Sequence, residues 1–259
     1  MSLQANLDFL ARRLSQRAAL SDADRAAVSA LPFQHRYLNP SAYVVREGEP
    51  PRPHCSFVLA GLAFRHKLTV NGSRQIVSIH LTGDLLDLQH LFLNIADHSV
   101  QALTELEVAD IEREPLRQIA LERPAVGQAL WIDGLVDASI YREWVLNVGR
   151  RDARARIAHI LCEIAVRMHA AGVIDAADFH LPMTQEQLGD ATGMTSVHVN
   201  RTLKALAKDG IINHSGRWIA IKDWDKIRRE GDFNPLYLHL DQVAPHFAGS
   251  LSSLFPKTV

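Results

Sequence analysis

The 259-residue sequence has few cysteines, no long apolar run and almost no net charge. Its two cysteines, Cys55 and Cys162, are too few for a disulfide framework, a structural zinc site or a four-cysteine iron–sulfur cluster. No apolar run reaches the roughly 18–20 residues of a transmembrane helix. The first twenty residues also lack the unbroken apolar stretch of a signal peptide. We therefore expect a cytoplasmic protein that has no contact with membranes.

The net charge of −1 hides a split along the chain. Residues 1–149 carry a net charge of −3 and residues 230–259 carry −2, whereas residues 150–229 carry +4. A basic block inside a nearly neutral chain indicates a polyanionic partner for that block alone. A solvated charged surface is the alternative explanation, and the charge count by itself does not decide between them.

The first third of the chain changes from a helical to a β pattern. Leucines recur at helical spacing in the first fifteen residues, and Ser21 is placed to cap a second short helix. Short β-branched and aromatic runs then alternate with turn signals over residues 33–112. Asn71–Gly72 lies between two such runs and favours a tight hairpin. This pattern predicts an antiparallel sandwich, jelly roll or barrel.

A long helix is predicted for residues 124–149, beginning at Pro124. Apolar and small residues recur along it in steps of three and four, which is typical of a seam between two helices of a dimer. Leu130, Leu135 and Leu146 lie off this seam and are expected to face the body of their own chain. The alternative is a helix that packs only on its own β-domain. The predicted seam consists of Trp131, Gly134, Ala138, Tyr141, Val145 and Val148.

Residues 181–221 read as helix, tight turn, helix and hairpin, which is a winged helix-turn-helix pattern. Thr184 and Gln187 form a capping box, and Gly193 provides the positive φ that the turn requires. Thr195 or Ser196 caps the second helix. Three apolar residues of that helix are expected to pack toward the first helix: Val199, Leu203 and Leu206.

The face left outward on the second helix has the chemistry of a DNA reader. A helix fits the major groove and presents its first turns to base edges. Arg201 can donate two hydrogen bonds to guanine, Asn200 can pair with adenine, and Val197 can contact a thymine methyl group. A polar helix face in a protein–protein module is the alternative. The predicted DNA contacts are Thr184, Thr195, Ser196, Val197, His198, Asn200, Arg201, Lys204 and Arg217.

Over roughly residues 20–225 the sequence resembles the Crp–Fnr family of bacterial transcription regulators. The resemblance is strongest in GMTSVHVNRTLKALAKDGII, in RIAHILCEIA and in GDLLDLQHLF. It implies an α+β protein with an N-terminal antiparallel jelly roll, a long dimerisation helix and a C-terminal winged helix-turn-helix. It also implies a homodimer on palindromic double-stranded DNA, with RNA polymerase as a candidate partner. The expected boundaries are 1–123 for N-terminal helices and sensor domain, 124–149 for the dimerisation helix, 150–231 for the DNA-binding domain, and 232–259 for a loosely packed tail.

The sequence departs from the family pattern at functional positions. Family members place a glutamate where Val197 stands, so we expect an altered operator at the base which that glutamate reads. Members that bind cyclic AMP carry Gly–Glu at Asp87–Leu88 and Arg–Ser at His98–Ser99. A carboxylate with only a histidine opposite is a poor cradle for a phosphate. The expected effector pocket consists of Gly83, Asp87, Leu88, His98 and Ser99.

These departures argue against cyclic AMP, and the cysteine count argues against an iron–sulfur cluster, so the effector stays unknown. A haem or a cyclic nucleotide is the alternative signal. An enzyme that uses Asp87, His90 and His98 in a β-domain cavity is a remote alternative, because no GxSxG, HExxH, GxGxxG or P-loop motif occurs in the chain. We therefore expect no catalytic residues and no metal site.

Overall fold

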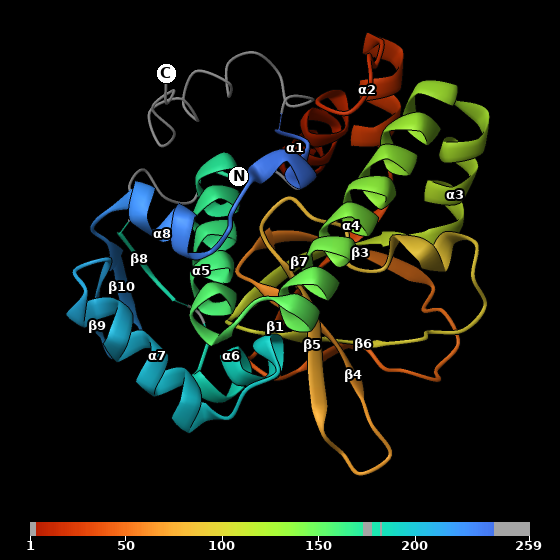
Figure 1. Cartoon of the computed structure of the whole chain (residues 1–259). Coiled ribbons are helices and arrows are strands. Elements are labelled where there is room, and N and C mark those ends of the chain that lie inside the picture. Colours follow the sequence, from red (N-terminus) through yellow and green to blue (C-terminus); the bar gives the residue numbers. More distant parts are fainter. Residues whose placement is uncertain (1–3, 173–177, 182, 241–259) are drawn as a thin grey trace. The chain divides into compact units, whose positions relative to one another are not determined.

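The computed structural model describes residues 4–172, 178–181 and 183–240, and the chain divides into two compact units (Figure 1). The β-rich unit comprises the described residues up to Lys67 together with Ile79–Ala138. The C-terminal unit comprises Leu68–Ser78 and the described residues from Ser139 onward. No helix in the described part of the chain is long and apolar enough to cross a bilayer.

The N-terminal half of the chain contains the β-structure that the sequence pattern predicts. Strands β1, β7 and β3 form one sheet, and β2, β6, β4 and β5 form the other, in these orders. The pairings of β7 with β1 and β3, and of β6 with β2 and β4, are antiparallel. The elements are α1 (Gln4–Ser15), α2 (Asp22–Ser29), β1 (Phe33–Leu38), β2 (Tyr43–Val45), β3 (His54–Ala60), β4 (Ala63–Leu68), β5 (Arg74–His80), η1 (Leu88–Leu91), β6 (Ser99–Ala102), β7 (Leu106–Glu112) and α3 (Arg113–Glu122).

The local signals behave as expected. Ser21 caps α2 in a capping box with Asp24. The Asn71–Gly72 pair forms the turn between β4 and β5, where the φ of Gly72 is +83°. Because only glycine adopts this conformation without steric cost, Gly72 helps to fix the register of the hairpin.

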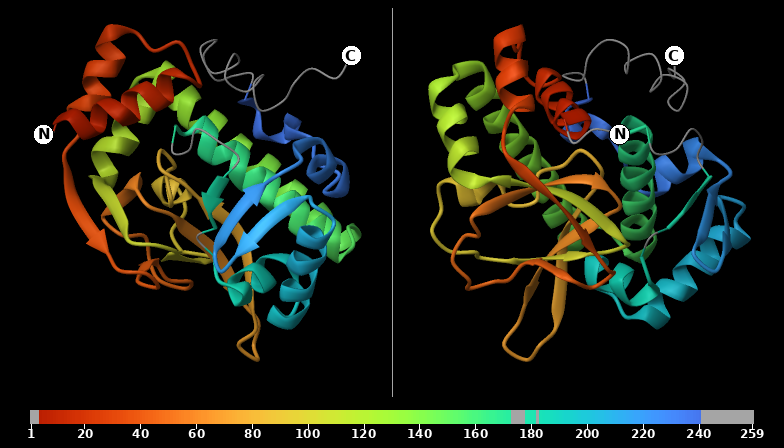
Figure 2. Two further views of the ribbon diagram at one scale, coloured as in Figure 1. Left: turned by 90° about the vertical axis from the view of Figure 1, so that its left-hand side faces the viewer. Right: turned by 180° about the vertical axis from the view of Figure 1, so that it is seen from behind.

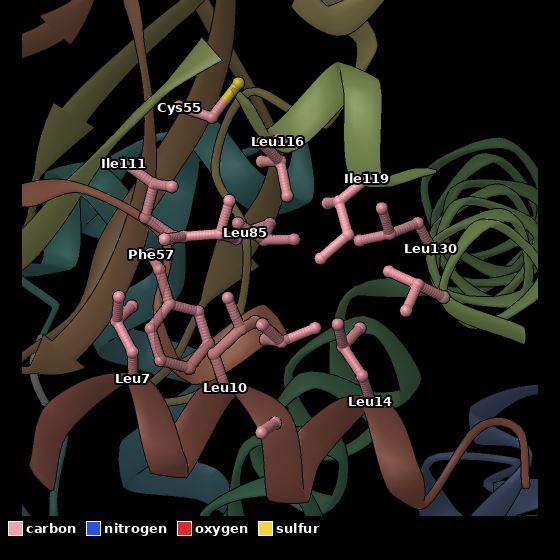
Figure 3. Close-up of a cluster of buried hydrophobic side chains, with 14 of the residues drawn as sticks. Leu7, Leu10, Leu14, Cys55, Phe57, Leu85, Ile111, Leu116, Ile119 and Leu130 are labelled. Atoms are coloured by element: carbon pink, nitrogen blue, oxygen red, sulfur yellow. The ribbon is translucent and has the colours of Figure 1, made fainter. Parts of the chain in front are cut away.

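The core of the β-rich unit has two parts, which lie on opposite sides of the sheet that contains β3. Side chains alternate between the faces of a strand, so Phe57 packs with the helical residues Leu7 and Leu10 while Val58 packs with the other sheet (Figure 3). Phe57 and Val58 are both fully buried. Burial of each such side chain contributes roughly 1.5–3 kcal/mol, so β3 is fixed from both faces.

A cluster of charged and polar side chains around Asp110 connects several segments of this β-structure. Asp110 on β7 accepts hydrogen bonds from Arg36 Nε at 2.6 Å, Arg52 Nη2 at 2.9 Å and Ser56 Oγ at 2.6 Å. Burial alone raises the pKa of Asp110, but the hydrogen bonds from Arg36 and Ser56 together with the charges of Arg52 and Arg36 more than offset it, so this pKa lies below its ordinary value. The carboxylate therefore links three segments of the unit: β1, β3 and the loop that carries Arg52.

We predict that Asp110→Asn destabilises the protein by about 2–3 kcal/mol at pH 7, because it leaves two part-buried guanidinium groups without their carboxylate. A pKa that is lowered by folding contributes stability above the unfolded pKa, and this stability is lost as the pH falls. The difference from wild type should therefore shrink below about pH 4. Urea denaturation measures it. Glu114→Gln, which removes an exposed ion pair with Arg117, is the matched control, and an equal loss in both variants would contradict the prediction.

Helix α4 (Pro124–Arg150) is the long helix expected from the sequence, and it is followed by the elements of the C-terminal unit. Asp152 caps α5 by accepting a hydrogen bond from Ala155 N at 2.9 Å, so the helical path breaks at residues 151–152. Strand β8 joins the expected hairpin, giving the sheet order β8-β10-β9. The elements are α5 (Ala153–Ala170), β8 (Asp178–His180), α6 (Gln185–Thr192), α7 (Ser196–Lys208), β9 (Ile212–Ser215), β10 (Trp218–Ile221), α8 (Trp224–Glu230) and η2 (Pro235–Leu238).

Two expectations about packing are wrong. The stretch after α8 is not loosely packed as far as Leu240, because Phe233 is 4% exposed and Leu238 is 3% exposed. The remainder of the expected tail, 241–259, lies outside the described residues. On α4, Leu130 is buried as expected, but Leu135 and Leu146 are 52% and 43% exposed. They do not face the body of the chain, because that side of α4 is occupied by residues such as Val136 and Ile140.

Candidate functional site

The helix-turn-helix is assembled from local signals in α6 and the turn that follows it. Thr184 Oγ1 accepts a hydrogen bond from Gln187 N at 3.1 Å, and Gln187 Oε1 accepts one from Thr184 N at 2.9 Å. This capping box satisfies donors at the helix start that would otherwise lack partners. Leu188 and Ala191 are fully buried. Helix α6 therefore begins and packs as the sequence predicts.

Two glycines make the tight turn possible. Gly193 ends α6 with a φ of +66°, which is the left-handed conformation that the sequence requires there. Gly189 has a second role, because a Cβ at this position would lie 2.4 Å from the carbonyl oxygen of Met194. The backbone of α6 thus approaches the turn more closely than any side chain would permit.

Helix α7 packs through one face and presents the other. Thr195 is the N-cap, and its hydroxyl accepts from His198 N at 3.3 Å, which decides between the two expected caps. Val199, Leu203 and Leu206 are at most 1% exposed. Figure 2 shows α7 beside the hairpin of β9 and β10, which forms the wing.

The opposite face of α7 carries most of the residues proposed to contact DNA. Helix α7 contains no acidic residue. Val197 is 61% exposed, although an apolar side chain gains nothing from contact with water. Thr184 is half-buried, and its hydroxyl, like that of Thr195, already serves as a cap. The exposed residues of the set are Thr195, Ser196, Val197, His198, Arg201, Lys204 and, in the wing, Arg217.

Asn200 differs from its neighbours. It is half-buried, and its Nδ2 donates a hydrogen bond to Gln185 Oε1 at 3.1 Å. This contact sets the orientation of the Asn200 amide group. It also leaves the amide nitrogen of Gln185 as a hydrogen-bond donor at the start of α6. Sequence reasoning missed Gln185, because periodicity within one helix gives no information on a partner in another. Its position directly after the Thr184 cap is the one available signal.

The expected effector residues lie in the interior of the β-rich unit, where Asp87 is fully buried. Ser56 N donates to Asp87 Oδ1 at 2.8 Å, and Asp87 Oδ2 has no hydrogen-bond partner among the described residues. Burial raises the pKa of Asp87 to about 7. At neutral pH the group is therefore divided between its neutral and ionised forms.

His98 does not supply a positive charge to this region. Its Nδ1 lies 2.7 Å from Asp97 Oδ1, and its Nε2 lies 3.1 Å from Gln89 Nε2. Burial, together with the charge of Arg65, lowers the pKa of His98 to about 4, so the ring is neutral at pH 7. Ser99 Oγ accepts from Glu47 N at 3.0 Å.

The other two expected effector residues face the helices of the β-rich unit. Leu88 packs against the core that contains α1, and the position of a Gly83 Cβ would be 3.4 Å from the ring of Phe9. The structure therefore does not join Gly83 and Leu88 to the hydrogen bonds of His98 and Ser99.

Arg65, on β4, is a buried charge that sequence reasoning missed. Its Nη2 donates to Leu86 O at 3.0 Å and its Nη1 lies 3.4 Å from Asp137 Oδ2. The guanidinium contributes to the pKa shifts of Asp87 and His98. Because an arginine in a strand usually points to water, no sequence pattern indicated that Arg65 lies in the interior.

The predicted dimer seam is partly exposed on α4. Trp131 and Val145 are 72% and 73% exposed, and a Cβ at Gly134 would meet no atom within 4 Å. Ala138, Tyr141 and Val148 are half-buried. The exposed Leu135 and Leu146 widen this apolar strip.

Neither cysteine is placed for metal or redox chemistry. Cys55 and Cys162 are both buried and unpaired, and burial raises the pKa of each thiol. In the part of the chain that the structure describes, no group of three or more His, Cys, Asp or Glu residues is placed to hold a metal ion.

Comparisons with known proteins agree with this architecture. The family model of the cyclic nucleotide-binding domain matches residues 35–123, and that of the Crp-like helix-turn-helix domain matches residues 155–230. The transcriptional activator protein FnrL of Cereibacter sphaeroides is 31% identical over 177 residues, which is 67% of this chain and 71% of that protein. The nitrogen fixation regulation protein FixK of Azorhizobium caulinodans is 27% identical over 177 residues, covering 66% and 69%.

Among solved structures, FixK2 from Bradyrhizobium japonicum has a TM-score of 0.71 at 26% identity and covers 77% of this chain and 98% of its own. Fold and site together define a DNA-binding transcription regulator with a helix-turn-helix and a β-hairpin wing. The chain belongs to the Crp/Fnr family, whose members are transcription regulators and not enzymes.

The pKa of Asp87 gives a prediction for stability. A carboxyl group whose pKa is raised by folding contributes its full stability only below its unfolded pKa of about 4, and this contribution is lost as the pH rises to about 7. Asp87→Asn keeps an acceptor for Ser56 N and does not ionise. We expect the variant to be more stable than wild type by roughly 2–4 kcal/mol at pH 8, with no gain at pH 4.

Urea denaturation from pH 4 to pH 8 measures this difference. Glu105→Gln, at an exposed carboxyl group, is the matched control and should follow wild type throughout. Parallel curves for wild type and Asp87→Asn would show that Asp87 does not titrate between pH 4 and pH 7.

Proposed function

We propose that this regulator is a homodimer that reads a palindromic site in double-stranded DNA with one α7 helix from each protomer. In this proposal residues 1–123 form the sensor domain and residues 124–149 form the dimerisation helix. Residues 150–231 form the DNA-binding domain, and residues 232–259 form a C-terminal extension. The observation that carries it is the exposed face of α7, which is free of acidic residues and presents Arg201 and Lys204 beside an exposed Val197.

Base recognition follows from the side chains on that face. Arg201 has two parallel donors for guanine O6 and N7, which is the commonest specific contact in the major groove. Val197 is suited to the methyl group of thymine and has no acceptor for cytosine N4. We therefore expect the half-site to favour thymine where relatives with a glutamate read cytosine. Asn200, held by Gln185, offers its free carbonyl and amide hydrogen to adenine.

Backbone recognition falls to the remaining residues. Thr184, Thr195 and Ser196 lie at helix N-termini, where N–H groups and the helix dipole favour phosphate oxygens. His198 and Lys204 flank the reading face, and Arg217 lies at the wing next to the turn at Gly216. Such contacts set the position of the protein on DNA and make binding dependent on salt.

Selection of bound DNA from a random pool with the purified protein tests sequence-specific binding. We expect an inverted repeat with half-sites about one helical turn apart. Arg201→Ala should weaken binding to the selected site by about 1–3 kcal/mol and relax the preference for guanine at one position of each half-site. Arg117→Ala, at an arginine of α3 whose side chain is 38% exposed and lies outside the DNA-binding residues, is the matched control. Equal affinities of wild type and Arg201→Ala for the selected site would contradict the role of Arg201.

Dimerisation through α4 is supported by the exposed strip that contains Trp131 and Val145. A seam with a step of three or four residues keeps one face of a helix against its partner. Gly134 and Ala138 are small enough to allow the two helices to approach closely. Exposed apolar side chains are unfavourable in water, so covering them with a second protomer lowers the free energy.

We predict that Val145→Glu converts the dimer to a monomer, because it places two like charges in the seam and removes apolar area. Analytical ultracentrifugation measures the dissociation constant, which should rise at least about a hundredfold. Val70→Glu makes the same change at a fully exposed site outside α4 and should leave the dimer intact. A dimer of undiminished affinity in Val145→Glu would exclude α4 as its interface.

Two known types of effector do not suit this chain. A cyclic phosphate requires fixed positive charge, and among the positions that depart from the family pattern this chain has a buried Asp87 and a neutral His98. An iron–sulfur cluster requires more ligands than two buried thiols. We therefore propose that neither cyclic AMP nor an iron–sulfur cluster gates DNA binding. RNA polymerase in the cytoplasm is the proposed partner on DNA.

A further inference from the structure

The segment Gly231–Leu240, called the C-terminal strap below, lies directly after the residues matched by the helix-turn-helix model, which end at 230. Its backbone lies against α5 at its first residue, because a Cβ on Gly231 would be 2.6 Å from His159 N. His159 Nδ1 lies 3.1 Å from the Gly231 carbonyl oxygen, to which it donates. The strap therefore begins with a contact that only glycine permits.

Aromatic side chains hold the strap along α5. The ring of His159 lies 5.2 Å from that of Phe233 in an edge-on arrangement and 5.8 Å from that of Tyr237 in a stacked one. The Tyr237 hydroxyl donates to Glu163 Oε2 at 2.7 Å. His159 is fully buried and Glu163 is 1% exposed. Two turns of α5 are thus covered by the strap.

The same strap reaches the last turns of α4. Glu163 also accepts from Trp144 Nε1 of α4 at 3.1 Å, so one buried carboxylate joins α4, α5 and Tyr237. His239 Nε2 lies 3.1 Å from Ser139 Oγ, also on α4.

The helix break is tied to the strap as well. Arg151, at the break between the helices, donates to Glu143 Oε1 at 2.6 Å and to the Asp232 carbonyl oxygen at 3.0 Å. The strap therefore contacts α4, the break and α5.

Helix α5 transmits this constraint to α7. The side chains of α5 from Ile157 to Val166 are buried, and α5 packs against α6, α7 and α8. A rotation at the break would carry α7 with α5 relative to the end of α4. Helices α4 and α5 are also joined directly, because Asn147 Nδ2 donates a hydrogen bond to Arg156 O at 3.3 Å. The strap contacts add to these direct contacts between the two helices.

We propose that the C-terminal strap is a positioning element for DNA binding, in which Tyr237 and Glu163 hold the angle between α4 and α5 and so set the half-site spacing that the dimer accepts. This rests on the proposed function, because two α7 helices have a defined separation only in a dimer. Tyr237 acts through the helices it joins and does not touch DNA.

The first experiment compares operators of different spacing. We expect Tyr237→Ala, which removes both the hydrogen bond to Glu163 and the stacking on His159, to bind the selected operator about tenfold more weakly. Insertion of one base pair between the half-sites should cost this variant much less than it costs wild type, and affinity for a single half-site should not change. Tyr237→Phe keeps the stacking on His159 and should fall between the two. Leu236→Ala, at a residue that is 75% exposed, is the control. An equal loss on all operators, or no loss, would overturn the proposal.

The second experiment needs no DNA. A spin label on Lys208→Cys, at the exposed end of α7, reports the distance between the two α7 helices of a dimer by electron–electron dipolar spectroscopy. We expect a narrow distribution with the strap intact and a broader one in Tyr237→Ala. If the distance distribution broadens in Tyr237→Ala but the protein binds no DNA, the role of the strap in fixing the helix angle stands and the proposed function is refuted. If the distribution is the same in both proteins and the protein binds DNA, only the positioning role of the strap is refuted.

Discussion

The burial of one face of α7 is the constraint on which the functional surface depends. Val199, Leu203 and Leu206 occupy the interior of the C-terminal unit, and a helix with three buried positions in successive turns has no freedom to rotate about its axis. Arg201 and Lys204 therefore point outward because their neighbours point inward. The capping box at Thr184 and the glycines of the turn act on the same constraint, since they fix where α6 ends and how closely α7 follows it.

The interior of the β-rich unit follows a different principle. Its buried polar side chains are bound mostly to one another and to the backbone: Arg65 to Leu86 O, Asp87 to Ser56 N, and Asp110 to two arginines. Such interactions specify how the strands pack. Asp87 stands out because one of its oxygens has no partner among the described residues.

The sequence predicted those features that depend on neighbours along the chain. The caps at Ser21 and Thr184, the positive φ of Gly193 and the buried face of α7 were all visible as local patterns, and the structure confirms them. Features that depend on distant residues were missed or misplaced. Asn200 looked like a free outward side chain because its partner Gln185 lies on another helix. Leu135 and Leu146 were assigned to the wrong side of α4, since an apolar residue suits the core and a dimer seam equally well.

The C-terminal strap shows the same limit at a larger scale and bears on regulation. The prolines Pro235, Pro245 and Pro256 indicated a loose tail, yet Phe233 and Leu238 are buried. A signal reaches DNA only through an element with two arrangements of similar free energy. The break at residues 151–152 is a natural place for such an element, because the helix hydrogen bonds are interrupted there. With Arg151 bonded to Glu143 and to the strap, any second arrangement has to replace buried charge interactions, so the break resists small perturbations and changes only as a unit.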